Sequence, residues 1–350
     1  MNSPFVPGLR LAGLFYAEVV GPLLAAEFPG LEHAAALLGP GSEVLGFDTP
    51  RSVDHDWGPR LQVLLNNHDL APRIEGVLAS RLPATFRGYP VVFATTPDPR
   101  PRHRVDVTGL SEYLTGRLGF DPLCSVRTVD WLATPTQRLA EVTAGAVFHD
   151  GPGALTQVRV LLEWYPRDVW LYVLACQWQR IAQEEAFPGR CAEAGDELGS
   201  AVVTARIVRD LMRLWLLMHR RYPPYSKWLG SAFGSLGNGT GVGAALKAAL
   251  KAALTATDWP SREAQLCAAY AATAAAHNRL KLTGALDTSP RGYYDRPYQV
   301  IDAGRFAAAL TDAISDPALR QRARTGAVDQ FIDSTDALGD SRLTRAAVST

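Results

Sequence analysis

Residues Leu45 to Arg60 read LGFDTPRSVDHDWGPR, and the architecture expected for the whole chain follows from this segment. Its pattern predicts a short buried strand over 43–47, a Gly-Phe turn, and then Asp54 and Asp56, one residue apart. On an extended backbone both carboxylates lie on one face, because alternate residues of a strand do. Two carboxylates about 4 Å apart repel by roughly 4 kcal/mol at an effective dielectric constant of about 20. A divalent metal with oxygen ligands relieves this repulsion, so the pair predicts a metal site, with a solvated turn as the alternative.

A third acid lies in the segment RVDV, residues 104–107. Asp106 stands between two β-branched residues, a pattern typical of a central strand, and a carboxylate in that position needs a partner. If this strand neighbours the acidic segment above, three carboxylates converge. Such a site is enough to hold two magnesium ions together with the phosphate oxygens of a nucleotide. The alternative is a structural salt bridge between Asp106 and Arg102 or Arg104.

Composition limits the class of protein. The chain has 350 residues, of which 47% are hydrophobic, and carries 35 Lys plus Arg against 35 Asp plus Glu. It is therefore no disordered polymer, and its length suggests two domains or one large domain with an appendage. Zero formal charge argues against nucleic acid or an anionic membrane as the main partner.

The N-terminus lacks a signal-peptide pattern, and no run is expected to span a membrane. The four cysteines are widely spaced and indicate neither a zinc site nor a disulfide scaffold. We expect a cytoplasmic protein.

Strand and helix patterns alternate only in the first part of the chain. Strands are predicted at 60–65, 89–94, 103–107 and 146–148, and helices at 8–28, 31–38, 68–82 and 136–143. After Gly153 the strand patterns stop, and long helices are predicted at 168–187, 199–221, 243–255 and 262–282. We therefore expect an α+β chain, with a mixed sheet and its helices over 1–150 and an all-helical domain over 151–350.

A glycine turn after a strand, Asp-x-Asp, a third Asp on a later strand and a following helical domain together resemble the nucleotidyltransferase superfamily of the DNA polymerase β and aminoglycoside nucleotidyltransferase type. The segments GFDTPRSVDHDWGPR (46–60) and WYPRDVWLYVLACQWQRIAQEEAF (164–187) resemble more closely a family of nucleotidyltransferase-like proteins classed as a domain of unknown function, DUF4037. The resemblance implies a mixed sheet with helices, followed by a helical domain that selects the acceptor.

The superfamily pattern implies roles for the acids. Asp54 and Asp56 would be metal ligands, and Asp106 the third carboxylate and general base. The implied cofactor is a pair of Mg²⁺ ions, with Mn²⁺ as a substitute, and the implied substrate is ATP or another nucleoside triphosphate. Gly46 would be the turn glycine that lets the triphosphate approach the backbone. The superfamily usually has Gly-Ser or Gly-Gly and then about ten residues, whereas Phe47 follows Gly46 and six residues intervene before Asp54.

Phosphate contacts are expected from nearby polar and cationic side chains. Ser52 would donate a hydrogen bond to a phosphate, and Arg51 and Arg60 would clamp it, or else serve as resting counter-ions of the acids. Lys227, set among aromatic residues in RRYPPYSKWLG (220–230), is a further candidate for a phosphate or substrate contact. The alternative for Lys227 is an ordinary surface position.

The helical half contains a charged row. Arg206, Arg209, Asp210 and Arg213 recur at spacings of three and four and share one helix face. Either Asp210 pairs with the flanking arginines, or the row faces a triphosphate.

The reaction expected is transfer of a nucleoside monophosphate, AMP from ATP, to an acceptor hydroxyl with release of pyrophosphate. A small-molecule acceptor is favoured over nucleic acid, because the chain has no net positive charge. One alternative is a non-catalytic nucleotidyltransferase-like protein that binds nucleotide or a partner protein. Another is an Asp-x-Asp glycosyltransferase, which normally has a longer Rossmann-like region ahead of its motif than the 53 residues present here.

Overall fold

The computed structural model describes residues 5–96, 98–236 and 241–348. The chain forms two compact units. The first comprises residues 1–130 and 137–163, and the second comprises 131–136 and 164–350. The units thus divide at 163/164, and the short segment 131–136 belongs to the second unit, whereas the sequence pattern predicts a single boundary near residue 150.

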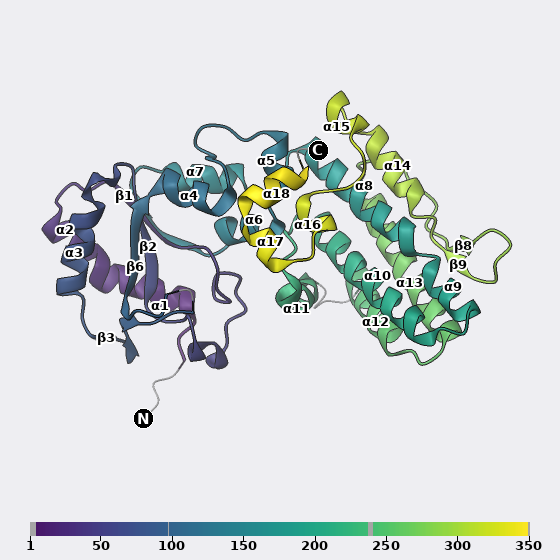
Figure 1. Ribbon diagram of the computed structural model, residues 1–350, viewed down its shortest axis with the longest axis horizontal. Coiled ribbons are helices and arrows are strands. Elements are labelled where there is room, and N and C mark those ends of the chain that lie inside the picture. Colours follow the sequence, from purple (N-terminus) through teal and green to yellow (C-terminus); the bar gives the residue numbers. More distant parts are fainter. Residues whose placement is uncertain (1–4, 97, 237–240, 349–350) are drawn as a thin grey trace. The chain divides into compact units, whose positions relative to one another are not determined.

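The first unit is built on a five-stranded mixed sheet (Figure 1). Its strand order is β5 (Val92–Phe93), β6 (Arg102–Gly109), β2 (Arg60–Leu65), β1 (His33–Leu37) and β7 (Ala146–Asp150). Strands β2 and β6 are parallel, and β1 runs antiparallel to both β2 and β7. In the parallel pair, Arg60 lies opposite Arg104 and Gln62 lies opposite Asp106. The expected mixed sheet is confirmed.

Helices of the first unit cover this sheet. They are α1 (Gly8–Phe15), a π-helical turn (Tyr16–Val20), α2 (Gly21–Glu27), α3 (Ala71–Arg81), α4 (Leu110–Leu118), α6 (Thr136–Thr143) and α7 (Ala154–Leu161). Helix α5 (Thr128–Ala133) spans the boundary between the two units at 130/131. A separate two-stranded sheet pairs β3 (Thr85–Phe86) with β4 (Tyr89–Pro90). One apolar core joins α1, β2, α3 and β6 through Leu11, Phe15, Leu61, Val63, Ile74, Leu78 and Val105. Each such side chain stabilises the fold by about 1.5–3 kcal/mol. The core therefore holds the parallel strand pair in place.

Strand β1 replaces the helix predicted at 31–38. Its sequence HAAAL is alanine-rich, which favours a helix by intrinsic propensity, but all five residues are buried between β2 and β7. Small side chains let neighbouring layers approach the strand closely. Burial on both sides has overridden the local preference.

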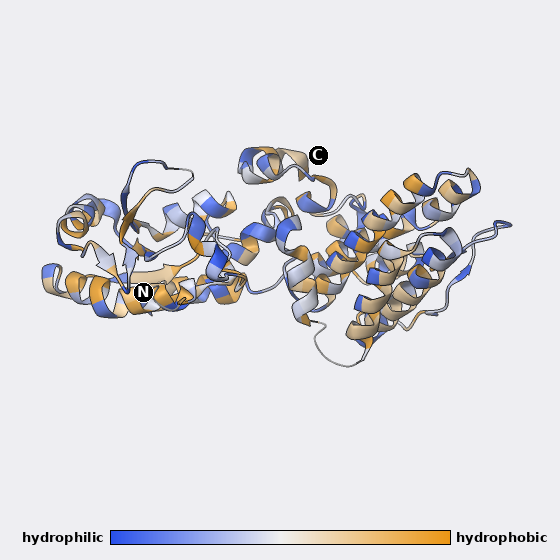
Figure 2. Ribbon diagram, turned by 90° about the horizontal axis from the view of Figure 1, so that it is seen from below, coloured by the Kyte–Doolittle hydropathy of each residue, from blue (hydrophilic) through white to orange (hydrophobic). Residues whose placement is uncertain are grey.

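The second unit is mostly helical. Its long helices are α8 (Arg167–Glu184), α10 (Glu197–Met218), α12 (Val242–Thr255) and α13 (Trp259–Arg279), with shorter helices α9 (Phe187–Glu193), α11 (Ser226–Leu236), α14 (Gly304–Asp312), α15 (Pro317–Gln321), α16 (Val328–Phe331), α17 (Thr335–Gly339) and α18 (Ser341–Val348). Trp178 of α8 stacks on Phe306 of α14 with ring centroids 4.4 Å apart. Figure 2 shows that these helices carry both apolar residues, in orange, and hydrophilic residues, in blue.

The four long helices predicted from sequence are confirmed with ends shifted by a few residues. The prediction that this part is entirely helical is wrong in one place, because β8 (Arg291–Gly292) and β9 (Gln299–Val300) form a two-stranded hairpin. Among the described residues, one stretch, 8–27, is long and apolar enough to cross a membrane, with a mean hydropathy of 1.4. Leu11 and Phe15 from this stretch lie in the core of the first unit, and 28% of the apolar window is buried.

Candidate functional site in the first unit

The acidic segment lies in the loop 38–59, which connects the antiparallel neighbours β1 and β2. An ion pair between Arg60 and Glu43, both largely buried, holds the start of this loop in place. Arg60 donates from Nε to Glu43 Oε1 over 2.8 Å and from Nη2 to the carbonyl of Pro40 over 2.7 Å. Gly41, with φ +147°, leaves room for this pair, because a Cβ there would collide with Arg60 Nη2 and lie 2.6 Å from Glu43 Oε2. Arg60 therefore positions the loop in this structure.

Residues 42–47 form a turn, not the predicted strand. The backbone N–H of Phe47 donates to the carbonyl of Ser42 over 2.8 Å, and that of Gly46 donates to Glu43 over 3.1 Å. Gly46 adopts φ +74°, where a side chain is strained. The strand prediction is wrong because these backbone hydrogen bonds close a turn here, and Glu43 is buried in a pair with Arg60.

Gly41 and Ser42 are a signal that the sequence reasoning missed. They follow β1 after three intervening residues, 38–40, and the eleven residues 43–53 separate Ser42 from Asp54. This spacing agrees with the Gly-Ser and roughly ten-residue loop of the superfamily pattern. The role expected for Gly46 stays a prediction, and Gly41 is a second glycine to which the same pattern can be matched.

Asp54 and Asp56 do not lie on a strand, which corrects the geometry assumed from their spacing. Asp54 ends a 3₁₀ helix, η2 (Pro50–Asp54), and Asp56 has φ +53°. Local chemistry starts the helix: Ser52 Oγ accepts a hydrogen bond from the backbone N–H of Thr49 over 3.0 Å, in a capping box. Asp is among the residues that tolerate the left-handed region. Ser52, predicted to contact phosphate, thus acts here as a helix cap.

The partners of the two acids are a histidine and a backbone amide. Asp54 Oδ1 lies 2.7 Å from His55 Nδ1, and both side chains are more than half exposed. Asp56 Oδ1 accepts a hydrogen bond from the N–H of Thr96 over 2.5 Å. Within the described residues, neither carboxylate has an ion pair with Lys or Arg, so both remain open to an external cation.

Asp106, on β6, is held by an arginine of its own strand. Arg102 Nη2 donates to Asp106 Oδ1 over 3.1 Å, as the structural alternative from the sequence predicts. No group of three or more His, Cys, Asp or Glu side chains is placed to hold a metal ion within residues 5–96, 98–236 and 241–348. The predicted meeting of Asp54, Asp56 and Asp106 is therefore not present, because η2 replaces the strand that would have aligned them.

A second acid organises the loop before β6. Asp98 accepts hydrogen bonds from Arg100, Arg102 and Arg104 at 3.1–3.2 Å. These bonds, the one from Arg100 first, hold the pKa of Asp98 well below its usual range. Arg104 is buried and also donates to the carbonyl of Phe93 over 2.9 Å. The loop that meets Asp56 through Thr96 is thus fixed to β6.

The remaining predicted contacts are dispersed. Arg51 is exposed on η2. Lys227 belongs to α11 of the second unit, where Nζ lies 5.1 Å from the ring centroid of Trp228. No phosphate is needed to account for the place of Lys227, and its predicted role stays a prediction.

The charged row of α10 is neutralised within the second unit. Arg206 pairs with Glu184, and Arg213 donates to Asp329 over 2.9 Å. Asp210 pairs with Arg180 of α8 over 3.3 Å, not with the arginines beside it. Both sequence interpretations of this row thus missed its true partners, which come from other helices.

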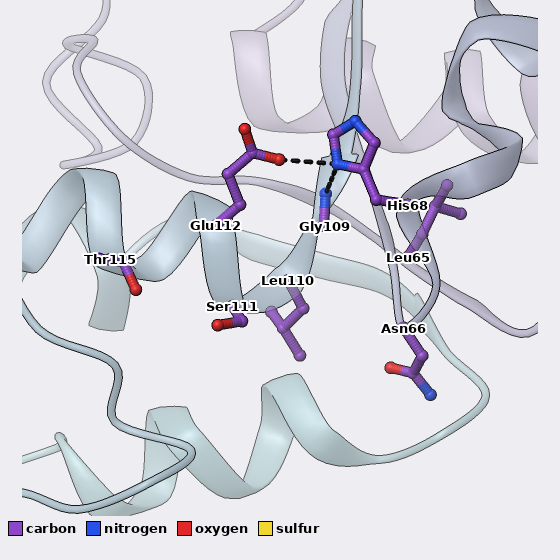
Figure 3. Close-up of a pocket in the computed structure, with 8 residues that line it drawn as sticks. All are labelled: Leu65, Asn66, His68, Gly109, Leu110, Ser111, Glu112 and Thr115. Atoms are coloured by element: carbon purple, nitrogen blue, oxygen red, sulfur yellow. Dashed lines mark hydrogen bonds and ion pairs between the residues drawn. The ribbon is translucent and has the colours of Figure 1, made fainter.

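A cavity of about 430 Å³ lies at the carboxyl ends of the parallel strands β2 and β6 (Figure 3). Its polar lining centres on His68, whose Nδ1 lies 2.7 Å from Glu112 Oε2. The hydroxyl of Thr108 also donates to Glu112, which lowers the pKa of that carboxyl; His68 adds to the shift. The acidic loop precedes the amino end of β2, so the two features lie at opposite ends of the strand pair.

Comparison with known proteins finds one family model that matches part of the chain. Residues 131–229 match the family model described as "Domain of unknown function (DUF4037)". This match confirms the DUF4037 resemblance and includes the quoted segment 164–187, while the acidic loop lies outside the matched range. A nucleotidyltransferase-like protein from Exiguobacterium sibiricum 255-15 has a solved structure similar over 77% of this chain and 78% of that chain, with 13% sequence identity and a TM-score of 0.32. No curated protein matches the chain.

Proposed function

We propose, for a chain whose residues 131–229 match DUF4037, that the first unit is a metal-dependent nucleotidyltransferase. It would move a nucleoside monophosphate, AMP from ATP or the equivalent from another triphosphate, to an acceptor hydroxyl and release pyrophosphate. One observation carries the proposal: Gly41-Ser42 lies after β1 and Asp54-x-Asp56 lies before β2, so one loop between adjacent antiparallel strands contains both a Gly-Ser turn and an acidic pair.

The side chains of Asp54 and Asp56, the acidic pair, are suitable ligands for a divalent cation. Asp54 and Asp56 supply carboxylate oxygens, the ligands that Mg²⁺ prefers, and neither is neutralised by a lysine or arginine among the described residues. Asp106 does not fit while Arg102 holds it. We therefore assign the metal to the pair. When bound, the ion would supply charge neutralisation for the triphosphate.

The chain's own groups would bind and orient the triphosphate. Gly46, where an added Cβ would meet open space, leaves the loop backbone accessible to phosphate oxygens, and the Ser42 hydroxyl would donate to one of them. Arg51, exposed on η2, would add a charged contact. Arg60 would act indirectly, by holding the loop through Glu43.

The acceptor hydroxyl would attack the α-phosphorus. The new bond forms between that phosphorus and the acceptor oxygen, the bond to the β-phosphate oxygen breaks, and pyrophosphate leaves. Asp106, once released from Arg102, is the group proposed to take the hydroxyl proton.

A second candidate function is nucleotide or partner binding without transfer. The ion pair between Asp106 and Arg102 favours it, because the proposed base is occupied. The glycosyltransferase alternative gains no support from the sheet, in which β2 and β6 are parallel and the other described pairs are antiparallel.

The test is to incubate the full chain with Mg²⁺ and each α-labelled nucleoside triphosphate, in the presence of a small-molecule cell extract, and to measure pyrophosphate and labelled product. Asp54→Asn and Asp56→Asn are expected to lose transfer while remaining folded by circular dichroism. Asp69→Asn is the matched control, since Asp69 is also exposed but lies after β2.

Nucleotide binding without pyrophosphate release would favour the second candidate. Transfer that persists in either variant would overturn the metal assignment.

A further inference from the structure

The segment 211–257 of the second unit contains no acidic residue. It is 47 residues long and carries six Lys and Arg but no Asp or Glu, whereas about one residue in ten is acidic over the whole chain. It also contains three of the four lysines of the protein. The formal charge of zero is therefore an average, because this segment is strongly basic and the rest of the chain is acidic by the same amount.

Five of these six cations are exposed. The exception is Arg213, which is buried and pairs with Asp329. In the part of the chain that the structure describes, none of the other five forms an ion pair with a carboxylate. We call them the basic surface: Arg220, Arg221, Lys227, Lys247 and Lys251. Their positive charge is thus not neutralised by neighbouring side chains.

The cations of the basic surface lie on helices that pack together, since α11 and α12 both contact α10 (Figure 1). Lys227 and Gly234 are seven residues apart on α11, so they lie on one side of the helix about 10 Å apart. Lys247 Nζ lies 3.6 Å from the position that a Cβ of Gly234 would occupy, and Lys251 follows one turn along α12. Arg221 precedes Lys227 by six residues, which span at most about 20 Å. The charges therefore form one continuous surface.

The apolar side chains of α11 and α12 indicate what kind of partner this surface fits. Leu229, Phe233, Leu246 and Leu250 are buried, and of the large apolar side chains described in the two helices only Leu254 is exposed. A helix that binds a bilayer needs an exposed apolar face, and a protein interface needs an apolar centre. A nucleic acid needs cations for its phosphates and, when single-stranded, aromatic rings for its bases.

Aromatic rings lie among the cations. Tyr225, two residues before Lys227, is 38% exposed. Lys227 Nζ lies 5.1 Å from the ring centroid of Trp228, and Arg220 Cζ lies 4.7 Å from that of Trp170. A ring beside a cation can stack on a base while the cation contacts the adjoining phosphate.

We propose that the second unit binds single-stranded nucleic acid on the basic surface. The argument from zero net charge concerns the whole chain, whereas contacts with phosphates depend on charges within a Debye length, about 8 Å at physiological ionic strength. This inference goes beyond the proposed function and does not depend on the acidic pair of the first unit.

The experiment measures fluorescence anisotropy of labelled oligo(dT) and oligo(U), about 16 nucleotides long, with the full chain in EDTA and without nucleoside triphosphate. If all five cations contact phosphates, the logarithm of the binding constant should fall with the logarithm of salt concentration with a slope of about −3.5. Affinity should then drop about 100-fold between about 50 and 200 mM salt.

The variant that combines Lys247→Gln with Lys251→Gln should weaken binding at least about tenfold at low salt. It should also reduce the steepness of the salt dependence by about 1.4, because two contacts are lost. Tyr225→Leu should weaken binding without a change in slope, since stacking involves no charge.

Lys281→Gln is the matched control for Lys251→Gln, because Lys281 is also an exposed lysine of the second unit but lies outside 211–257. It is expected to bind like wild type, and circular dichroism checks that each variant is folded. Equal weakening by Lys281→Gln and Lys251→Gln, or no binding by wild type, would overturn the proposal. Tighter binding to phosphatidylserine vesicles or to polyglutamate than to either oligonucleotide would overturn it as well.

The outcome is separate from the proposed function. The double variant Asp54→Asn, Asp56→Asn is expected to bind both oligonucleotides like wild type, because its changes lie in the first unit. Loss of oligonucleotide binding in this double variant would contradict the placement of the site on the second unit.

Discussion

The carboxylate of Asp56 accepts a hydrogen bond from the backbone N–H of Thr96, with 2.5 Å between Oδ1 and N. This bond ties the acidic loop after β1 to the loop that leads into β6. Asp98, Arg102 and Asp106 follow along that second segment. The two acidic regions that the sequence singles out are therefore linked through a main-chain contact, although their carboxylates do not converge.

We expect Asp56→Asn to keep this link and lose the charge. An asparagine oxygen accepts the same hydrogen bond, so the free energy of unfolding should change by less than about 0.5 kcal/mol. Asp56→Ala removes the bond and should cost about 1 kcal/mol. Urea denaturation measures the difference, and Mn²⁺ affinity should fall in both variants. Equal stability of the two variants would mean that the contact with Thr96 contributes nothing.

Gly41→Ala should destabilise the first unit more than Gly46→Ala. Both positions have positive φ, but a Cβ at 41 would meet Arg60 and Glu43, whereas a Cβ at 46 has open space. We expect about 1–2 kcal/mol for Gly46→Ala, from backbone strain alone, and a larger loss for Gly41→Ala. Thermal unfolding of both variants tests this order, and the reverse order would contradict the role given to the Glu43–Arg60 pair.

The free energy of unfolding of the second unit should fall as pH rises from about 4.5 to about 7. Glu185 is buried, accepts hydrogen bonds from the N–H groups of Ile301 and Ala303 at 3.0 Å, and burial raises its pKa from 4.5 to about 7. Between these values the folded state binds more protons than the unfolded state, so the free energy of unfolding drops by about 3 kcal/mol between pH of about 4.5 and 7.

Glu185→Gln should flatten that pH dependence, because glutamine stays neutral. The free energy of unfolding of wild type and variant is measured with denaturant at several pH values. The difference between the two at each pH removes the contribution of the other titrating groups, which both proteins share. The groups around Glu185 include Asp302, which adds to the raised pKa, and Tyr270, which is buried. A wild-type profile parallel to that of Glu185→Gln would contradict this prediction.

Asp329→Ala should cost about 3–5 kcal/mol, because it leaves the buried guanidinium of Arg213 without its carboxylate. Asp333→Ala is the comparison. Asp333 pairs with Arg209 one turn away on α10, but its side chain is 64% exposed, so we expect a loss below about 1 kcal/mol. Denaturant unfolding of the two variants distinguishes a buried from an exposed ion pair on the same helix. Similar losses would show that burial does not set the difference.

Local patterns predicted much of the fold. Strand β2 at 60–65 and helix α6 at 136–143 agree to the residue, because each has a clear periodicity and turn residues at its ends. Strand β1 was missed, because its alanines favour a helix and only burial between two neighbours makes them a strand. The η2 helix was missed as well, although Thr49 and Pro50 provide a recognisable start.

The candidate site was predicted in composition but not in geometry. The sequence left Arg102 and Arg104 open as partners of Asp106, and only the structure shows that Arg102 takes this role while Arg104 turns to Asp98. Partners distant in sequence, such as Asp329 for Arg213, lie beyond the reach of helical spacing rules. The Gly41-Ser42 turn, in contrast, was readable from the sequence.

The exchange of residues 131–136 has a practical consequence for dissecting the protein. The polypeptide passes between the units three times, after 130, 136 and 163. Thr136, whose N–H donates to Asp329 over 3.2 Å, would be absent from any fragment that starts at 164. Cutting the gene at a single point therefore yields pieces with severed internal contacts, and an isolated half that precipitates would say nothing about what the intact molecule does.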